Sequence, residues 1–163
     1  MRRFAPTSPE GIAATALVRA PTAADVESLA RLLLVAYRGT MDDEGETLED
    51  SRAVVRQLFA GEFGAMAWSI SELTEWVDSH AAAAGRPVAI AATLCTRFEE
   101  RPFVAFSVTD PLFQRPGLAR AGLVRAFGRL ADAGESVLRL VVTRGNGRAE
   151  RLYASLGFEP EQR

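Results

Sequence analysis

The sequence predicts a mixed α/β fold in which a single, mostly antiparallel sheet is flanked by helices. Its 163 residues, 48% apolar and 25% charged, have the size and composition of one globular domain. Strand-like and helix-like segments alternate along the chain. A strand, helix, strand, helix run over residues 103–156 implies a parallel crossover unit. We expect a flexible leader at residues 1–15 and one domain at residues 16–163.

The first half of the domain is expected to form a strand and two helices. Residues 16–19 make the strand, and an acidic loop at residues 39–50 follows the first helix. Each helix begins at a threonine followed three residues later by an aspartate, the spacing of side chains that cap a first turn. Gly61 stops the second helix. The capping pairs are Thr22 with Asp25 and Thr47 with Asp50.

The second half is expected to supply the centre of the sheet. Two apolar runs, residues 87–97 and 102–109, form a hairpin of central strands. The stretch before them fits a strand near residues 68–76, although some of its apolar residues also have helical spacing. After the hairpin come a helix that opens at Pro116-Gly117, a strand at residues 137–142 and a final helix at residues 146–156.

Composition excludes several classes of function. The formal net charge is −2, which indicates no nucleic-acid or membrane-surface role. One cysteine, Cys95, and one histidine, His80, exclude an intramolecular disulfide, a thiolate metal cluster and a multi-histidine metal site. No apolar run approaches the roughly 18 residues of a membrane helix. We therefore expect a cytoplasmic protein without a metal site, with Cys95 in the core.

The turn QRPGLARAGL, residues 114–123, is the first place where the sequence indicates a binding site. It leads from a strand into a helix, whose start exposes unpaired N–H groups and a partial positive charge that suit a phosphate. Gly117 and Ala119 let a ligand approach the backbone, and Arg115 and Arg120 add charged donors. Taken alone, these residues are also an ordinary helix start.

The final helix, NGRAERLYASLGF, is the second such place. Tyr153 lies on its apolar stripe, as a core residue or, since a phenol is protonated at neutral pH, as a proton donor to a departing thiolate. Asn146 stands at the strand-to-helix junction, where it can cap the helix or bind a ligand rich in amides. Taken alone, this segment too is consistent with a purely structural role.

The two segments together form a specific pattern. A Q-x-x-G-x-A turn, a helix, a strand and N-x-x-A-x-x-L-Y-x-x-L-G-F follow one another within residues 103–158. This combination resembles the GNAT-type N-acetyltransferase superfamily, whose members pass an acetyl group from acetyl-coenzyme A (acetyl-CoA) directly to an amine. The matching residues are Gln114, Gly117 and Ala119, then Asn146, Ala149, Leu152, Tyr153, Leu156, Gly157 and Phe158.

The resemblance implies that the central parallel strands, at residues 103–109 and 137–142, splay apart and hold acetyl-CoA between them. The pantetheine arm would bond the first strand, the diphosphate would lie on the turn at the start of the helix, and Tyr153 would protonate the leaving thiolate. The implied cofactor-binding residues are Ser107, Val108, Thr109, Gln114, Arg115, Gly117, Leu118, Ala119, Arg120 and Asn146.

The proton acceptor is sought in two groups of carboxylates. Glu99 and Glu100 lie in the hairpin turn at the end of a central strand, and with Tyr153 they are the catalytic candidates. The acidic loop supplies the second group, which would also attract a cationic amine. Each of these carboxylates also fits a solvated charge on a turn. The loop carboxylates are Asp42, Asp43, Glu44 and Glu46.

We therefore expect an acyltransferase that moves an acetyl group from acetyl-CoA to a primary amine of a small molecule or peptide in a ternary complex. A non-catalytic acyl-CoA-binding sensor or partner module of the same fold, and a purely structural domain, stay open. Members of the superfamily continue with further strands where only five residues follow Phe158 here, so we expect a truncated C-terminal end. Either a homodimer covers the resulting edge or the acceptor site is more open.

Overall fold

The computed structural model describes residues 16–77, 86–114 and 117–161. The predicted leader, His80 and the pair Arg115-Pro116 lie outside the described residues. The strands are β1 (Ala16–Arg19), β2 (Ala65–Met66), β3 (Glu72–Trp76), β4 (Val88–Phe98), β5 (Arg101–Thr109) and β6 (Arg139–Leu140). The α-helices are α2 (Val26–Tyr37), α3 (Leu48–Ala60), α4 (Leu118–Asp132) and α5 (Gly147–Ser155), with 3-10 helices at Ala23–Asp25, Trp68–Ile70 and Pro111–Phe113.

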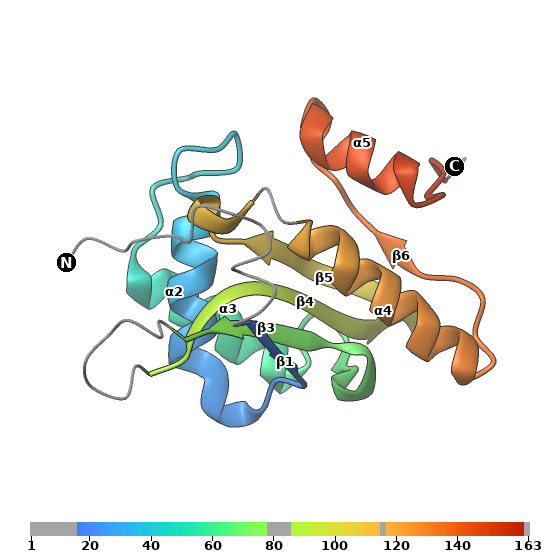
Figure 1. Ribbon diagram of the computed structural model, residues 1–163, viewed down its shortest axis with the longest axis horizontal. Helices are drawn as coiled ribbons and strands as arrows, with labels where there is room; N and C mark the ends of the chain where they lie inside the picture. Colours follow the sequence, from blue (N-terminus) through green and yellow to red (C-terminus); the bar gives the residue numbers. More distant parts are fainter. Residues whose placement is uncertain (1–15, 78–85, 115–116, 162–163) are drawn as a thin grey trace.

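The strands form one sheet in the order β1, β3, β4, β5, β6, with β2 paired to β4 beside this path. All pairs are antiparallel except β5 with β6, which is parallel. In Figure 1, α4 lies across the face of the sheet turned to the viewer, and α5 stands apart at the end of the segment that follows β6. The predicted fold class, a mixed and mostly antiparallel sheet flanked by helices, is confirmed. The covering of the β6 edge by a second copy stays a prediction.

The first two helices begin where the sequence predicts. Asp25 accepts a hydrogen bond from the N–H of Thr22 (2.6 Å), and the Thr22 hydroxyl caps the first turn in return. The same exchange joins Thr47 and Asp50, at 2.7 Å and 3.2 Å. Gly61 ends α3 with φ of 86°, a conformation that favours glycine. The Thr47 and Asp50 cap fixes the C-terminal end of the acidic loop, which in the structure spans residues 38–47 between α2 and α3.

The strand predicted near residues 68–76 is shorter than expected and begins at Glu72. The reason is a 3-10 turn at Trp68–Ile70, which is followed by Ser71. The Ser71 hydroxyl accepts from the N–H of Cys95 (2.9 Å) and donates to a carbonyl one turn earlier (2.8 Å). The Ser71 side chain takes the place of a backbone hydrogen bond between β3 and β4, so β3 begins at the next residue, Glu72.

The sheet has a hydrophobic core on each face. On one face, α2 and α3 pack against β3, β4 and β5. On the other, α4 packs against Cys95 and Val104 of the central strands, and α5 adds partly buried residues. Cys95 is fully buried, as predicted, and burial raises the pKa of its thiol to about 12. Because the central strands β4 and β5 are buried on both faces, they form a stable base for the site that β5 borders.

Helix α4 approaches the sheet closely at Gly122. A Cβ atom there would lie 2.3 Å from Oγ1 of Thr93 and 3.1 Å from Oε1 of Glu72. The buried Glu72 carboxylate accepts two hydrogen bonds from Arg125 (2.8 Å and 2.6 Å) and one from Arg129 (3.3 Å). These contacts fix the position of α4 on the sheet, and with it the first turn of the helix.

Candidate active site

The parallel strands β5 and β6 pair only at Phe103 with Arg139 and at Val104 with Leu140. The predicted last strand is therefore short, because the chain leaves the sheet after Leu140 and runs to α5 (Figure 1). Along residues 105–109, the edge of β5 that faces away from β4 has no strand partner in the described part of the chain. The expected splay of the two strands is confirmed, and it opens a wedge between β5 and α5.

Two adjoining cavities occupy this wedge and the space beside the acidic loop. The α4 chamber, of about 460 Å³, lies between the end of β5, the start of α4 and α5. The acidic-loop chamber, of about 510 Å³, is bounded by α2, the acidic loop, α3, β5 and the segment after β6. The predicted residues that line the α4 chamber are Ser107, Val108, Thr109, Gln114, Gly117, Ala119, Arg120, Asn146 and Tyr153.

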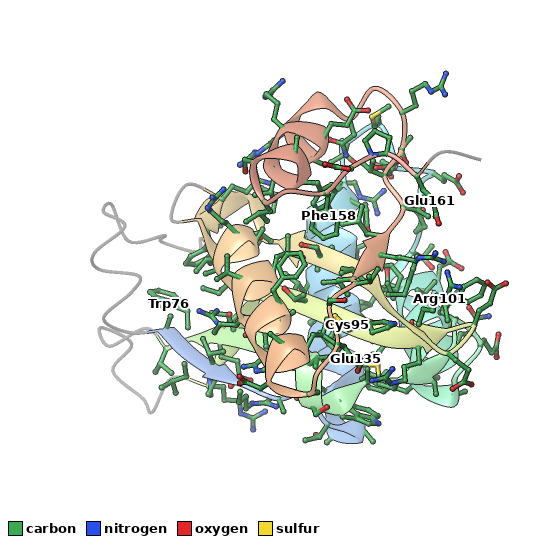
Figure 2. All side chains as sticks on the ribbon, turned by 90° about the vertical axis from the view of Figure 1, so that its right-hand side faces the viewer. Trp76, Cys95, Arg101, Glu135, Phe158 and Glu161 are labelled. Carbon is green, nitrogen blue, oxygen red and sulfur yellow. The ribbon has the colours of Figure 1, made fainter. Side chains whose placement is uncertain are left out.

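Three of the predicted site residues do not line the α4 chamber. The side chain of Leu118 packs into a small buried cluster with Ile90 and Phe113, while its backbone N–H belongs to the first turn of α4. Glu99 and Glu100 are exposed at the hairpin turn and line neither chamber. Figure 2 labels the adjoining Arg101 at the hairpin end of the sheet. Since a strand rises about 3.3 Å per residue, Glu100 is about 23 Å from Ser107 along β5.

Tyr153 stands where the two chambers meet. It lines both, and Ser107 on β5 lines both as well. Burial raises the pKa of the Tyr153 phenol, and the interaction of the phenol with the Ser107 side chain offsets part of the rise. Phe158, which is labelled in Figure 2, packs edge-on against the Tyr153 ring (centroids 5.6 Å apart) and also packs against Phe127 of α4 (5.2 Å). The boundary of the chambers therefore carries a fixed, protonated hydroxyl.

A second phenol, Tyr37, also lines both chambers, although it was not among the predicted site residues. Burial raises the pKa of Tyr37 to about 12, and the nearby Asp42, Tyr153 and Glu46 add to the rise. Tyr37 is the last residue of α2. Its place at the end of an apolar stripe is typical of a core residue, so the sequence carried no signal for a site.

The start of α4 offers backbone donors to the α4 chamber. Gly117 precedes the helix with φ of 72°, and its carbonyl accepts the N–H of Ala121 (3.0 Å). The N–H groups of residues 118–120 come before this first bond and have no acceptor within the helix. The start of α4 after Gly117 therefore offers free backbone donors, and the binding of an anion there stays a prediction.

Two arginines connect α5 with α4 and with the segment before α4. Arg120 donates to the Ser155 hydroxyl on α5 (2.7 Å), and Arg148 on α5 donates to the amide oxygen of Gln114. Both arginines line the α4 chamber and give it a positive wall. Arg148 was not predicted, because in the sequence it is one exposed position of an amphipathic helix.

Two neutral polar side chains of the α4 chamber have unused hydrogen-bonding groups. The Thr109 hydroxyl is buried without a partner among the described residues. Asn146 accepts the N–H of Ala149 through Oδ1 (3.2 Å) and so caps α5, one of its two predicted roles. No described residue accepts from the amide nitrogen of Asn146, which leaves its N–H groups free for a ligand.

The acidic loop divides its carboxylates between loop structure and the cavity. Asp43 accepts the N–H groups of Gly39 (2.7 Å) and Gly45 (2.9 Å), which lowers the pKa of its carboxyl, and Arg38 adds to the effect. Asp43 therefore holds the loop together. The other three carboxylates of the loop line the acidic-loop chamber, and Asp42 lines the α4 chamber as well. These three are Asp42, Glu44 and Glu46.

The chambers present hydroxyl, amide, carboxylate and guanidinium groups. Across residues 16–77, 86–114 and 117–161, no group of histidine, cysteine, aspartate and glutamate side chains is arranged to hold a metal ion. Within the same residues, no helix has the length and apolar character to cross a membrane.

Neither a protein-family model nor a curated protein sequence matches the chain. Among solved structures, the ribosomal-protein-S18-alanine N-acetyltransferase of Escherichia coli matches with a TM-score of 0.66 and 19% identity, over 90% of this chain and 79% of that one. The aminoglycoside 6'-N-acetyltransferase AAC(6')-IG of Acinetobacter haemolyticus matches at 0.59 and 13%, over 90% and 93%. The protein yncA of Salmonella typhimurium, solved with its cofactor acetyl-CoA, matches at 0.58 and 18%, over 89% and 80%.

These matches define the class of fold. The chain has the GNAT acetyltransferase fold, as the turn at Gly117 and the helix of Tyr153 predicted. At these identities the similarity concerns the fold, and the chemistry follows from the residues of the two chambers.

Proposed function

We propose that the protein moves an acetyl group from acetyl-CoA to a primary amine of a small molecule or peptide, by direct attack in a ternary complex. One observation carries this proposal: a cavity with a basic wall and a cavity with an acidic wall meet at Tyr153, where β5 and β6 have parted. Two substrates can therefore approach from different sides and meet beside one phenol.

The residues of the α4 chamber fit acetyl-CoA. Its diphosphate would be held by the free N–H groups at residues 118–120 together with Arg120 and Arg148. Its amide-containing arm would pair with the unpartnered edge of β5 at residues 107–109 and with the Asn146 amide. The acetyl-CoA in the yncA structure supports the same co-substrate here.

The reaction needs one group that accepts a proton and one that donates it. The amine arrives as an ammonium ion and loses a proton before its nitrogen bonds to the thioester carbonyl carbon. The carbon–sulfur bond then breaks, and we assign to Tyr153 the proton that the leaving thiolate takes up, because the raised pKa keeps this phenol protonated. The second proton of the attacking nitrogen restores the phenol, so the products are the amide, the thiol and one proton.

We place the proton acceptor at Asp42. This carboxylate lines both chambers, and no ion pair engages it among the described residues. Glu99 and Glu100, the predicted candidates, are exposed at the hairpin turn, so a proton would have to travel the length of the strand to reach them. Asp42 is close enough to Tyr37 to raise the pKa of that phenol, which places its charge at the wall that both chambers share.

A screen of amines with acetyl-CoA tests this function. Thiol release is followed for each amine with the wild-type protein and with Tyr153→Phe, and coenzyme A binding is measured in parallel by thermal shift. We expect thiol release that requires the amine and is slower in the variant. Coenzyme A binding without thiol release for any amine would indicate a non-catalytic binding module. Absence of both would contradict the proposed function and leave a structural domain.

A further inference from the structure

The two chambers differ in charge, and this difference indicates which charge the acetyl acceptor carries. The acidic-loop chamber is lined by Asp42, Glu44 and Glu46, and no arginine is among the described residues of its lining. The described ion pairs of the loop join Arg38 to Asp43 and leave these three carboxylates unpaired. An unneutralised acidic wall attracts a cation, and it disfavours an acceptor that carries a carboxylate or phosphate.

The same chamber also has an apolar lining. It includes aliphatic side chains of α2 and α3 together with an aromatic pair, Phe63 and Phe106, whose rings meet edge-on with centroids 6.4 Å apart. Phe63 stays 37% exposed, although it is a large apolar side chain at the rim of a cavity. An apolar surface left open inside a cavity is suited to the apolar part of a ligand.

The arrangement of these groups gives the ligand a direction. Asp42 is the carboxylate that lines both chambers, so a cationic head bound there lies next to Tyr153 and the α4 chamber. Phe63 lines the acidic-loop chamber and not the α4 chamber, so the apolar body extends away from that junction. The carboxylates all come from the acidic loop, and the other elements that line the chamber supply the apolar contacts.

We propose that the acceptor is a primary amine attached to an apolar group such as a phenyl ring or a branched alkyl chain. The inference rests on the proposed function, because it places the amine of this acceptor at the junction where transfer occurs. A free amine and the N-terminus of a peptide that begins with an apolar residue share this chemistry.

Calorimetry of amine binding without acetyl-CoA tests the inference independently of turnover. Phenethylamine is compared with 3-phenylpropionate, which has a similar body and the opposite charge, and with ethanolamine and spermidine, which lack an apolar end. Phenylalanyl-alanine amide represents the peptide source. We expect phenethylamine or the peptide to bind at least about tenfold more tightly than the other three ligands. The better of the two identifies the source.

Matched variants assign the binding to the two walls. Phe63→Ala and Asp42→Asn should each weaken binding of the preferred amine by about tenfold or more. The controls are Phe98→Ala, which also removes an exposed phenylalanine but at the hairpin turn, and Asp132→Asn at the end of α4, and neither should change the affinity. Equal losses for Phe63→Ala and Phe98→Ala would overturn the inference.

The outcomes separate the inference from the proposed function. Spermidine or ethanolamine binding as tightly as phenethylamine would overturn the apolar acceptor, even if thiol release occurs. Tight binding of phenethylamine that depends on Phe63 and Asp42, without thiol release in the presence of acetyl-CoA, would support the ligand class and contradict acetyl transfer. Binding and thiol release that both follow the apolar amines would support the two together.

Discussion

The side chains of Tyr153 on α5 and Ser107 on β5 interact with each other, although the strands that lead to them have already separated. This interaction lies at the boundary of the two chambers, since both residues line both. It sets the direction of the phenol, since the Tyr153 ring is packed on its other side against Phe158. The hydroxyl is therefore positioned by the protein before any substrate enters.

Replacing Tyr153 by phenylalanine should remove the proton donor while keeping the ring and its packing. We expect kcat to fall by about 10² to 10⁴-fold, the usual contribution of a general acid, with the affinity for coenzyme A retained. Ser107→Ala leaves the phenol in place but less fixed, so its loss of kcat should be smaller. Steady-state kinetics and coenzyme A titration check both variants. Equal kcat for Tyr153→Phe and wild type would remove the acid role.

The buried phenol of Tyr37 should make the free energy of unfolding fall at alkaline pH. Its pKa is raised to about 12 mainly by burial, whereas the unfolded chain loses this proton near pH 10. The folded protein therefore binds the proton more tightly, and the stabilisation, complete below about pH 10, is lost as the pH rises to about 12. We expect Tyr37 to account for about 2–3 kcal/mol of this loss in the free energy of unfolding.

Urea denaturation between pH 9 and about 12 measures this effect, and the chain is suited to it because it contains no lysine to titrate in the same range. Tyr37→Phe keeps the ring and should lose less stability than the wild type as the pH rises. If the free energy of unfolding fell with pH equally in the two proteins, the Tyr37 pKa would not be raised, and its hydroxyl would be hydrated in the folded state.

Local signals in the sequence predicted the framework of the site. The Thr47 and Asp50 cap, the hairpin at Glu99 and Glu100 and the helix start at Gly117 depend on neighbours within a few residues, and each is present in the structure. The helix that carries Asn146 is also where its residues indicated. Such features are set by backbone conformation and short-range hydrogen bonds, which a single sequence records.

Which residues line the two chambers could not be predicted, because it depends on contacts between segments far apart in the sequence. Whether Asp42 or Asp43 faces the cavity is decided by the bonds of Asp43 to two glycines of the loop. Arg148 enters the site only because α5 swings away from the sheet and turns toward Gln114. The hairpin glutamates are adjacent in sequence to β5, yet the wedge opens at the other end of that strand, as the position of Ser107 shows.

Asn146 has a capping role and a proposed binding role that substitution can separate. Asn146→Asp keeps an oxygen that accepts the N–H of Ala149, and its negative charge suits the start of a helix, so stability should be retained. The same change removes the amide donors and should lower the affinity for coenzyme A. Asn146→Ala should lower both that affinity and stability, the latter by about 1 kcal/mol. Thermal unfolding and coenzyme A titration check the pair. Unchanged affinity in both variants would confine Asn146 to capping.

Gly122 and Gly128 lie on the same helix and should respond oppositely to alanine. At Gly122 the new methyl group would lie 2.3 Å from the Thr93 hydroxyl, so Gly122→Ala should cost about 1–3 kcal/mol as α4 moves off the sheet. At Gly128 an added methyl group has nothing within 4 Å, so helix propensity should stabilise the variant by about 0.5–1 kcal/mol. Denaturant unfolding of both variants measures the difference. Equal stabilities would contradict the close approach at Gly122.

The ion pair beneath α4 should be costly to break from the arginine side. The Glu72 side chain is 2% exposed, so Arg125→Met combined with Arg129→Met would leave a buried carboxylate without its partners and lower the free energy of unfolding by about 3–5 kcal/mol. Arg129→Met alone should cost less, because Arg125 keeps its two shorter bonds. Adding Glu72→Met to the double variant removes the stranded charge and should restore much of the loss. A triple variant no more stable than the double would show that the missing salt bridge, and not the unpaired carboxylate, destabilises the protein.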